Sequence, residues 1–157
     1  MDLNTQNISS KMTIPPQLKG AYQRIVLAGQ KFLYDPSTRD IIKQQLAGPG
    51  PIDQKLGQGI SDMMIMLFNK SNHTMPPQLI IPAGVELLID AAEFLNKAAP
   101  NTVPKEAIGS ATEAMIFTLL QKFGIPKDKA MQMMHNFHQN AQKMNAGAPG
   151  AQTASGA

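Results

Sequence analysis

Hydrophobic residues recur at intervals of three and four along most of the chain, which is the period of one face of an α-helix. The pattern predicts six helices, which cover residues 15–34, 36–47, 52–70, 76–98, 104–123 and 125–144. Alternating runs of Val, Ile, Thr and aromatic residues, which would predict strands, do not occur. The predicted fold class is therefore all-α, a compact bundle of five or six helices.

Proline, glycine and aspartate mark the expected ends of these helices. Asp35 stands before Pro36, where its side chain can cap a helix whose first position favours proline. The run Gly-Pro-Gly-Pro at residues 48–51 is the clearest linker in the chain. Pro82 falls inside a predicted helix, so we expect either a kink there or a first turn separated from the main body.

The sequence Pro-Pro-Gln-Leu occurs twice, starting at Pro15 and at Pro76, 61 residues apart. A long predicted helix follows each copy, and residues 61–68 loosely resemble residues 112–120. A docking motif for Pro-rich recognition is one interpretation, but such motifs favour exposed, extended segments. We therefore interpret both copies as helix starts. Two related helical halves and a chance recurrence both remain open.

The domain organisation follows from composition. Residues 1–13 are polar and lack periodicity, which predicts a flexible arm, and residues 145–157 are rich in Ala and Gly, which predicts a disordered tail. A single helical domain is expected over residues 14–144. The N-terminus lacks the features of a signal peptide and no apolar run is long enough for a membrane span. We therefore expect a protein that is made in the cytosol.

The charge and the residue types limit the classes of function. The chain has no Cys, which excludes disulfides and thiolate metal sites, and its formal net charge is only +3. Its Lys and Arg residues are dispersed rather than clustered as in a typical nucleic-acid binder. A regulatory or nucleic-acid-binding helical module, suggested by the positive charge and by Arg39 in a short helix, remains the alternative function.

Few residues suggest catalysis or metal binding. His135 and His138 share a helix face, but no Glu-x-x-His sequence accompanies them as in di-iron bundles. Glu86, Asp90 and Glu93 form an acidic stripe, which we interpret as the solvated face of a helix. We therefore predict no catalytic residue, no cofactor and no metal ligand.

The glycines of Leu-Gly-Gln-Gly-Ile-Ser (residues 56–61) resemble a phosphate-binding loop only superficially, because no Gly-Lys-Ser/Thr follows them. We expect them to allow two helices to approach closely. Ser61 has no Gly-x-Ser-x-Gly context that would make it a nucleophile.

Methionine is the residue type most informative about binding, because its flexible side chain adapts to irregular surfaces. The chain has 11 methionines, several of them gathered in two predicted helices. The clusters point in more than one direction, which indicates apolar surface left for another subunit, although core filling explains them as well. The candidate interaction residues are Met63, Met64, Met66, Met131 and Met134.

Two segments resemble small all-helical proteins encoded in the structural-gene clusters of tailed bacteriophages. Residues 33–67 contain Tyr-Asp-x-x-Thr-Arg and then a Met-rich helix, and residues 75–98 open with Met-Pro-x-x-Leu-x-x-Pro-Ala. The resemblance implies a non-enzymatic virion structural or head/tail accessory protein, made in the host cytoplasm. It implies many copies and contacts with other virion or assembly proteins. Together with the methionine clusters, it predicts a homo-oligomer that assembles through apolar helix faces. If the protein is not viral, we expect it in the cytoplasm.

Overall fold

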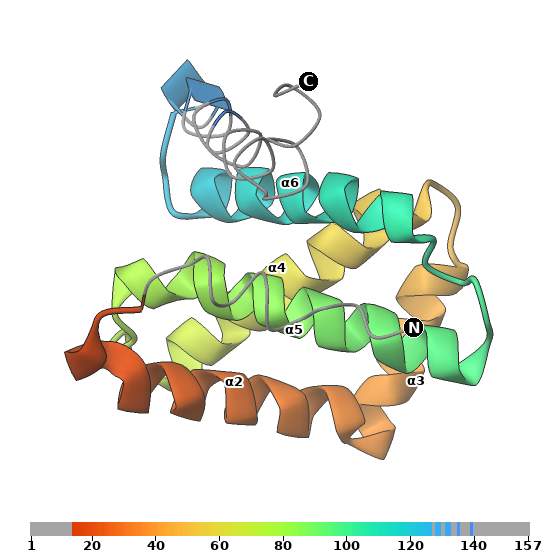
Figure 1. The fold of residues 1–157 in the computed structure, drawn as a ribbon, viewed down its shortest axis with the longest axis horizontal. Coiled ribbons are helices and arrows are strands. Elements are labelled where there is room, and N and C mark those ends of the chain that lie inside the picture. The colour runs from red at the N-terminus through yellow and green to blue at the C-terminus, as the bar shows by residue number, and fades with distance from the viewer. Residues whose placement is uncertain (1–13, 127, 130, 133–134, 136–138, 140–157) are drawn as a thin grey trace, which may run out of the picture. The chain divides into compact units, whose positions relative to one another are not determined.

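The computed structural model describes residues 14–126, 128–129, 131–132, 135 and 139. This part of the chain contains no strand, and the all-α prediction is confirmed. Its elements are one 3₁₀ turn and five α-helices (Figure 1): η1 (Pro16–Leu18), α2 (Lys19–Tyr34), α3 (Pro36–Ala47), α4 (Ile52–Lys70), α5 (Pro77–Ala98) and α6 (Lys105–Lys122).

These five helices match the first five predicted from the sequence. The predicted sixth helix lies largely outside the described residues, and the predicted arm (1–13) and tail (145–157) lie wholly outside them. The chain divides into two compact units, Met1–Leu119 and Leu120–Ala157. The first unit holds α2 to α5 and most of α6. The single domain expected over residues 14–144 stays a prediction.

Helix α5 forms the centre of the first unit. Half of its 22 residues are buried, and they surround the helix except on the side of Glu86, Asp90 and Glu93, as expected of a helix that is apolar on nearly all sides. It continues without a break through Pro82. The first turn is thus not separated from the main body, because a proline this near the start removes few of the hydrogen bonds of the helix.

Both Pro-Pro-Gln-Leu copies form the same turn. The carbonyl oxygen of Pro15 accepts a hydrogen bond from the backbone N–H of Leu18 at 2.9 Å, and Pro76 accepts one from Leu79 at 3.0 Å. Pro15 and Pro76 have similar extended backbones, with ψ angles of 138° and 126°. The interpretation of both copies as helix starts is therefore confirmed.

The helices that follow the two copies, α2 and α5, lie side by side and run in the same direction (Figure 1). Tyr22 contacts Glu86 near one end, and Tyr34 packs edge-on against Phe94 near the other, with ring centroids 5.6 Å apart. The paired residues are 64 and 60 positions apart, close to the 61 that separate the two motifs. The two helix starts are therefore level, an arrangement that two related halves would produce.

The two halves differ by one helix. Helix α3 separates α2 from α4, whereas residues 99–104 connect α5 directly to α6. The side chain of Asn96 holds this short connection, because it accepts a hydrogen bond from the backbone N–H of Val103 and donates one to its carbonyl oxygen, both at 2.9 Å. If the halves are related, α3 has no counterpart in the second half.

Helices α4 and α6 meet at Gly57. A Cβ atom at this position would lie 2.5 Å from the carbonyl oxygen of Ala111 and 2.9 Å from the backbone nitrogen of Met115. The buried hydroxyl of Ser61 donates to the carbonyl oxygens of Gly57, at 2.8 Å, and Met115, at 3.1 Å. The prediction that this glycine segment allows two helices to approach is confirmed for Gly57.

The two glycines of this segment provide a matched stability test. Gly57→Ala should lower the free energy of unfolding by about 1–3 kcal/mol, because the new methyl group meets the backbone of α6. Gly59→Ala should raise it by about 0.5–1 kcal/mol, because alanine favours the helix and its methyl would touch only the side chain of Gln45, at 3.4 Å. Urea denaturation monitored by circular dichroism measures both. Changes of the same sign would contradict the close approach at Gly57.

Candidate functional site

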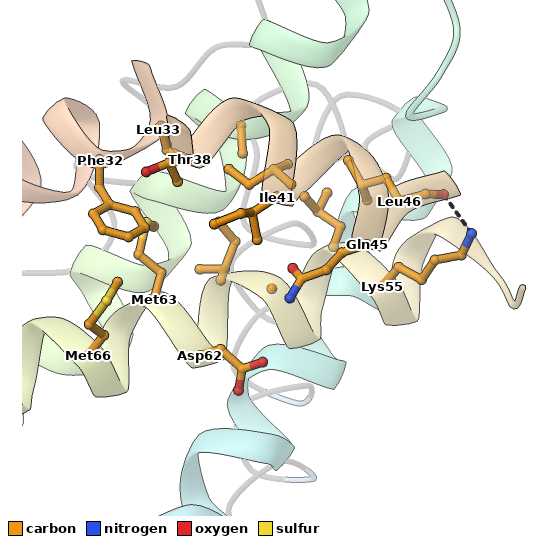
Figure 2. A pocket seen from close by; sticks show the side chains of 15 residues that line it. Phe32, Leu33, Thr38, Ile41, Gln45, Leu46, Lys55, Asp62, Met63 and Met66 are labelled. Carbon is orange, nitrogen blue, oxygen red and sulfur yellow. Dashed lines mark hydrogen bonds between the residues drawn. The ribbon is translucent and has the colours of Figure 1, made fainter. Parts of the chain in front are cut away.

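An apolar groove lies where α3 packs beside α2 and α4. It encloses a cavity of about 260 Å³, and α5 contributes to its floor. Figure 2 shows the side chains that surround it. The apolar residues that line the cavity are Phe32, Leu33, Ile41, Ile42, Leu46, Leu56, Ile60, Met63, Met66 and Ala91.

The groove exists because α3 buries little of its apolar surface. Thr38 is the only buried residue of this 12-residue helix. Ile42 and Leu46 are half-buried along the cavity, and Ile41 is 56% exposed at its edge. The beginning of α3 is thus packed, while the rest of the helix lies over space that its own side chains do not fill.

The volume of the cavity indicates what could enter it. Pockets for drug-sized ligands usually measure about 300–1,000 Å³, so the 260 Å³ found here falls below that range. An apolar cavity of about 150 Å³ already accommodates benzene. The groove therefore has room for one aromatic or branched aliphatic side chain from a partner protein, and its lining matches the chemistry of such a group.

Lys55, on α4, closes one end of the groove. Its ammonium donates a hydrogen bond to the carbonyl oxygen of Leu46 at 2.7 Å and another to that of Gly48 (Figure 2 shows the first). These carbonyls belong to the C-terminal end of α3, where backbone oxygens have no partner within the helix and the helix dipole attracts a cation. Lys55 therefore ties the end of α3 to α4.

The candidate methionines occupy different environments. Met63 and Met66 line the groove, with Met66 partly exposed, and Figure 2 places both near Phe32. Met64 is fully buried in the core and offers no surface to a partner in this fold. Met131, in the second unit, is 56% exposed. Met134 lies outside the described residues.

The acidic stripe on α5 is not a solvated face, so that interpretation is wrong. Glu86 accepts a hydrogen bond from the hydroxyl of Tyr22, and Asp90 accepts one from the side-chain amide of Gln30 at 2.8 Å. Both carboxylates and Glu93 are half-buried. The sequence did carry a signal for these contacts, because Tyr22 and Gln30 lie beside the apolar face of α2 and their polar groups need partners when that face packs.

Arg39, on which the nucleic-acid alternative rested, is directed against the protein. Its guanidinium lies 5.2 Å from the ring centroid of Phe94, and its residue is half-buried. The attraction between a cation and the face of an aromatic ring stabilises this position. No observation at Arg39 favours a contact with nucleic acid.

The histidines take part in local contacts. His73 stacks on Phe68, with ring centroids 4.9 Å apart, and His135 lies 3.0 Å from the side-chain nitrogen of Gln139. His138 lies outside the described residues. Within the described part of the chain, no group of three His, Cys, Asp or Glu side chains could hold a metal ion.

Comparison of the chain with protein-family models, with curated proteins and with solved structures finds no match. The resemblance to bacteriophage proteins thus stays a prediction from the sequence. Among the described residues, no helix is long and apolar enough to cross a membrane.

The contact between Tyr22 and Glu86 predicts a loss of stability at alkaline pH. Burial, the hydrogen bond to Glu86 and the nearby charges of Glu86 and Asp90 all raise the pKa of Tyr22 above its usual value of 10.0. A group whose pKa is higher in the folded protein than in the unfolded chain stabilises the fold at any pH below its unfolded-state pKa. This contribution is lost as the pH rises above that pKa. Above about pH 10, the free energy of unfolding should therefore fall more steeply in the wild type than in Tyr22→Phe.

Urea denaturation at about pH 8 and about pH 11 measures this difference. Tyr34→Phe is the matched control: burial also raises the pKa of Tyr34, but half of that side chain is exposed, so its substitution should change the pH dependence less. Equal pH dependence in the wild type and Tyr22→Phe would contradict the role of the buried contact.

Proposed function

We propose that this protein is a non-enzymatic helical interaction protein that self-associates through the groove beside α3, and that it serves as a virion structural or head/tail accessory protein of a tailed bacteriophage. The observation that carries the proposal is an exposed Ile41 at the edge of an apolar groove with room for one more side chain.

The occupant we propose for the groove is a second copy of the chain. Ile41 and the groove lie on the same face, so a two-fold axis passing near them would place Ile41 of each copy against the groove of the other. Such a self-complementary contact is the usual basis of a dimer. Burying one isoleucine side chain contributes about 1.5–3 kcal/mol, and the same contact would cover the apolar edge of α3 and the partly exposed Met66.

The virion role rests on the sequence resemblance of residues 33–67 and 75–98. A protein present in many copies needs a contact that it can make with itself, and the groove beside α3 supplies a candidate. The test is mass spectrometry of purified phage particles that carry the gene. Detection of the protein in several copies per particle would support the virion role. Absence from the particles would overturn the virion role and leave self-association to be judged by the test below.

The groove contact predicts that Ile41→Asp abolishes self-association. An aspartate at this position would bring a charge into the apolar contact, and desolvating it is unfavourable. Leu27→Asp is the matched control, because Leu27 is equally exposed, at 56%, but lies on α2 and does not line the cavity. Light scattering over a range of protein concentrations measures the mass of each variant, and circular dichroism checks that both are folded.

A wild type and a Leu27→Asp variant that associate, beside a monomeric Ile41→Asp, would support the proposal. A wild type that stays monomeric at high concentration would contradict it. So would an Ile41→Asp variant that associates as the wild type does, since the contact would then lie elsewhere.

A further inference from the structure

Helix α3 is joined to its neighbours in two different ways. A single residue, Asp35, connects it to the end of α2, whereas the four residues 48–51 connect it to α4. Within that longer connection Gly50 has a φ of +113°, a backbone region that favours glycine. The short connection therefore restricts the N-terminal end of α3, whereas the longer connection allows its C-terminal end to move.

The packing of α3 follows the same division. Near its start, Thr38 is 6% exposed, and Arg39 lies over Phe94. Asp35 caps the first turn, because its carboxylate accepts hydrogen bonds from the backbone nitrogen of Ser37, at 2.9 Å, and from its hydroxyl. The first turn of α3 is therefore fixed by burial, by a ring contact and by a cap.

The other end of α3 has weaker attachments. Ile42 and Leu46 are half-buried beside the cavity, and Ala47 is exposed. The ammonium of Lys55 holds this end by donating hydrogen bonds to the carbonyl oxygens of Leu46 and Gly48. Moving this end away from α4 would break those two hydrogen bonds and the contacts that Ile42 and Leu46 make beside the cavity.

We propose that the second half of α3 is a lid, held closed by Lys55, that opens while the first turn of α3 stays in place. The lid opens by local unfolding of the second half of α3 while α2, α4, α5 and α6 stay folded, and opening exposes Leu56 and Ile60 on α4. Elements with few buried contacts open locally in this way, without unfolding of the core. The proposal goes beyond self-association and holds whether or not a second copy occupies the groove.

Hydrogen–deuterium exchange of the full chain tests the lid. It is measured at a concentration at which light scattering shows only the monomer, so that association does not affect the result. Local opening exposes little surface, so exchange of amides in the second half of α3 should not change in low concentrations of urea. Amides of α5 exchange through unfolding, so their exchange should become faster as urea is added. Exchange of α3 and α5 with the same urea dependence would overturn the proposal.

Substitution of the lysine tests what holds the lid closed. Lys55→Met keeps the aliphatic stem and removes both hydrogen bonds, so exchange in the second half of α3 should accelerate roughly tenfold. Amides of α5 exchange through unfolding that breaks the same two bonds, so they should accelerate by no more than the same factor. Lys43→Met is the matched control, because Lys43 lies on α3 itself and is exposed. Equal acceleration by both substitutions, or none by Lys55→Met, would overturn the role of Lys55.

Discussion

The first unit depends on glycines that let neighbouring helices approach more closely than any side chain would allow. A Cβ atom at each of three positions would come within 3 Å of atoms on the adjoining helix. Each glycine links a different pair of helices: Gly29 of α2 with Leu87 of α5, Gly84 of α5 with Met115 of α6, and Gly57 of α4 with Ala111 of α6. The contacts join α2, α5, α6 and α4 in series, which explains how α5 becomes buried on nearly every side. At Gly57 the atoms in the way include backbone, so an added methyl group would push the helices apart, whereas at Gly29 and Gly84 the side chains of Leu87 and Met115 would have to move.

Local signals in the sequence were sufficient to predict the helices. Proline, a capping aspartate and the Gly-Pro-Gly-Pro linker each act on the few residues around them, so the predicted ends lie close to the observed ones. The close approach at Gly57 was also predicted, but the sequence did not distinguish Gly57 from Gly59, which meets only the side chain of Gln45. The acidic stripe was misread because a carboxylate looks the same in the sequence whether it meets water or a tyrosine. Only the parallel packing of α2 on α5 brings Tyr22 to Glu86.

The groove could be predicted only in part. Met63, Met64 and Met66 lie within one helical turn of α4, and neighbouring positions on a helix point about 100° apart. The sequence therefore marks the turn as apolar but does not say which methionine faces the core and which the surface. In the structure Met64 is fully buried, whereas Met63 and Met66 line the groove. The cavity itself depends on how far α3 stands from α4, which follows from packing over the whole first unit and leaves no local pattern.

The two halves suggested by the repeated motif help to explain where the groove lies. Both copies of Pro-Pro-Gln-Leu build the same turn, and the helices after them pack in parallel with their starts level. In such a shared architecture α2 corresponds to α5 and α4 to α6, whereas α3 has no counterpart. The cavity, the exposed Ile41 and the contact with Lys55 all arise where α3 meets that framework. Because Thr38 is the only buried residue of α3, exposed positions such as Ile41 can be changed, and binding and opening with them, while the buried residues of α5 stay as they are.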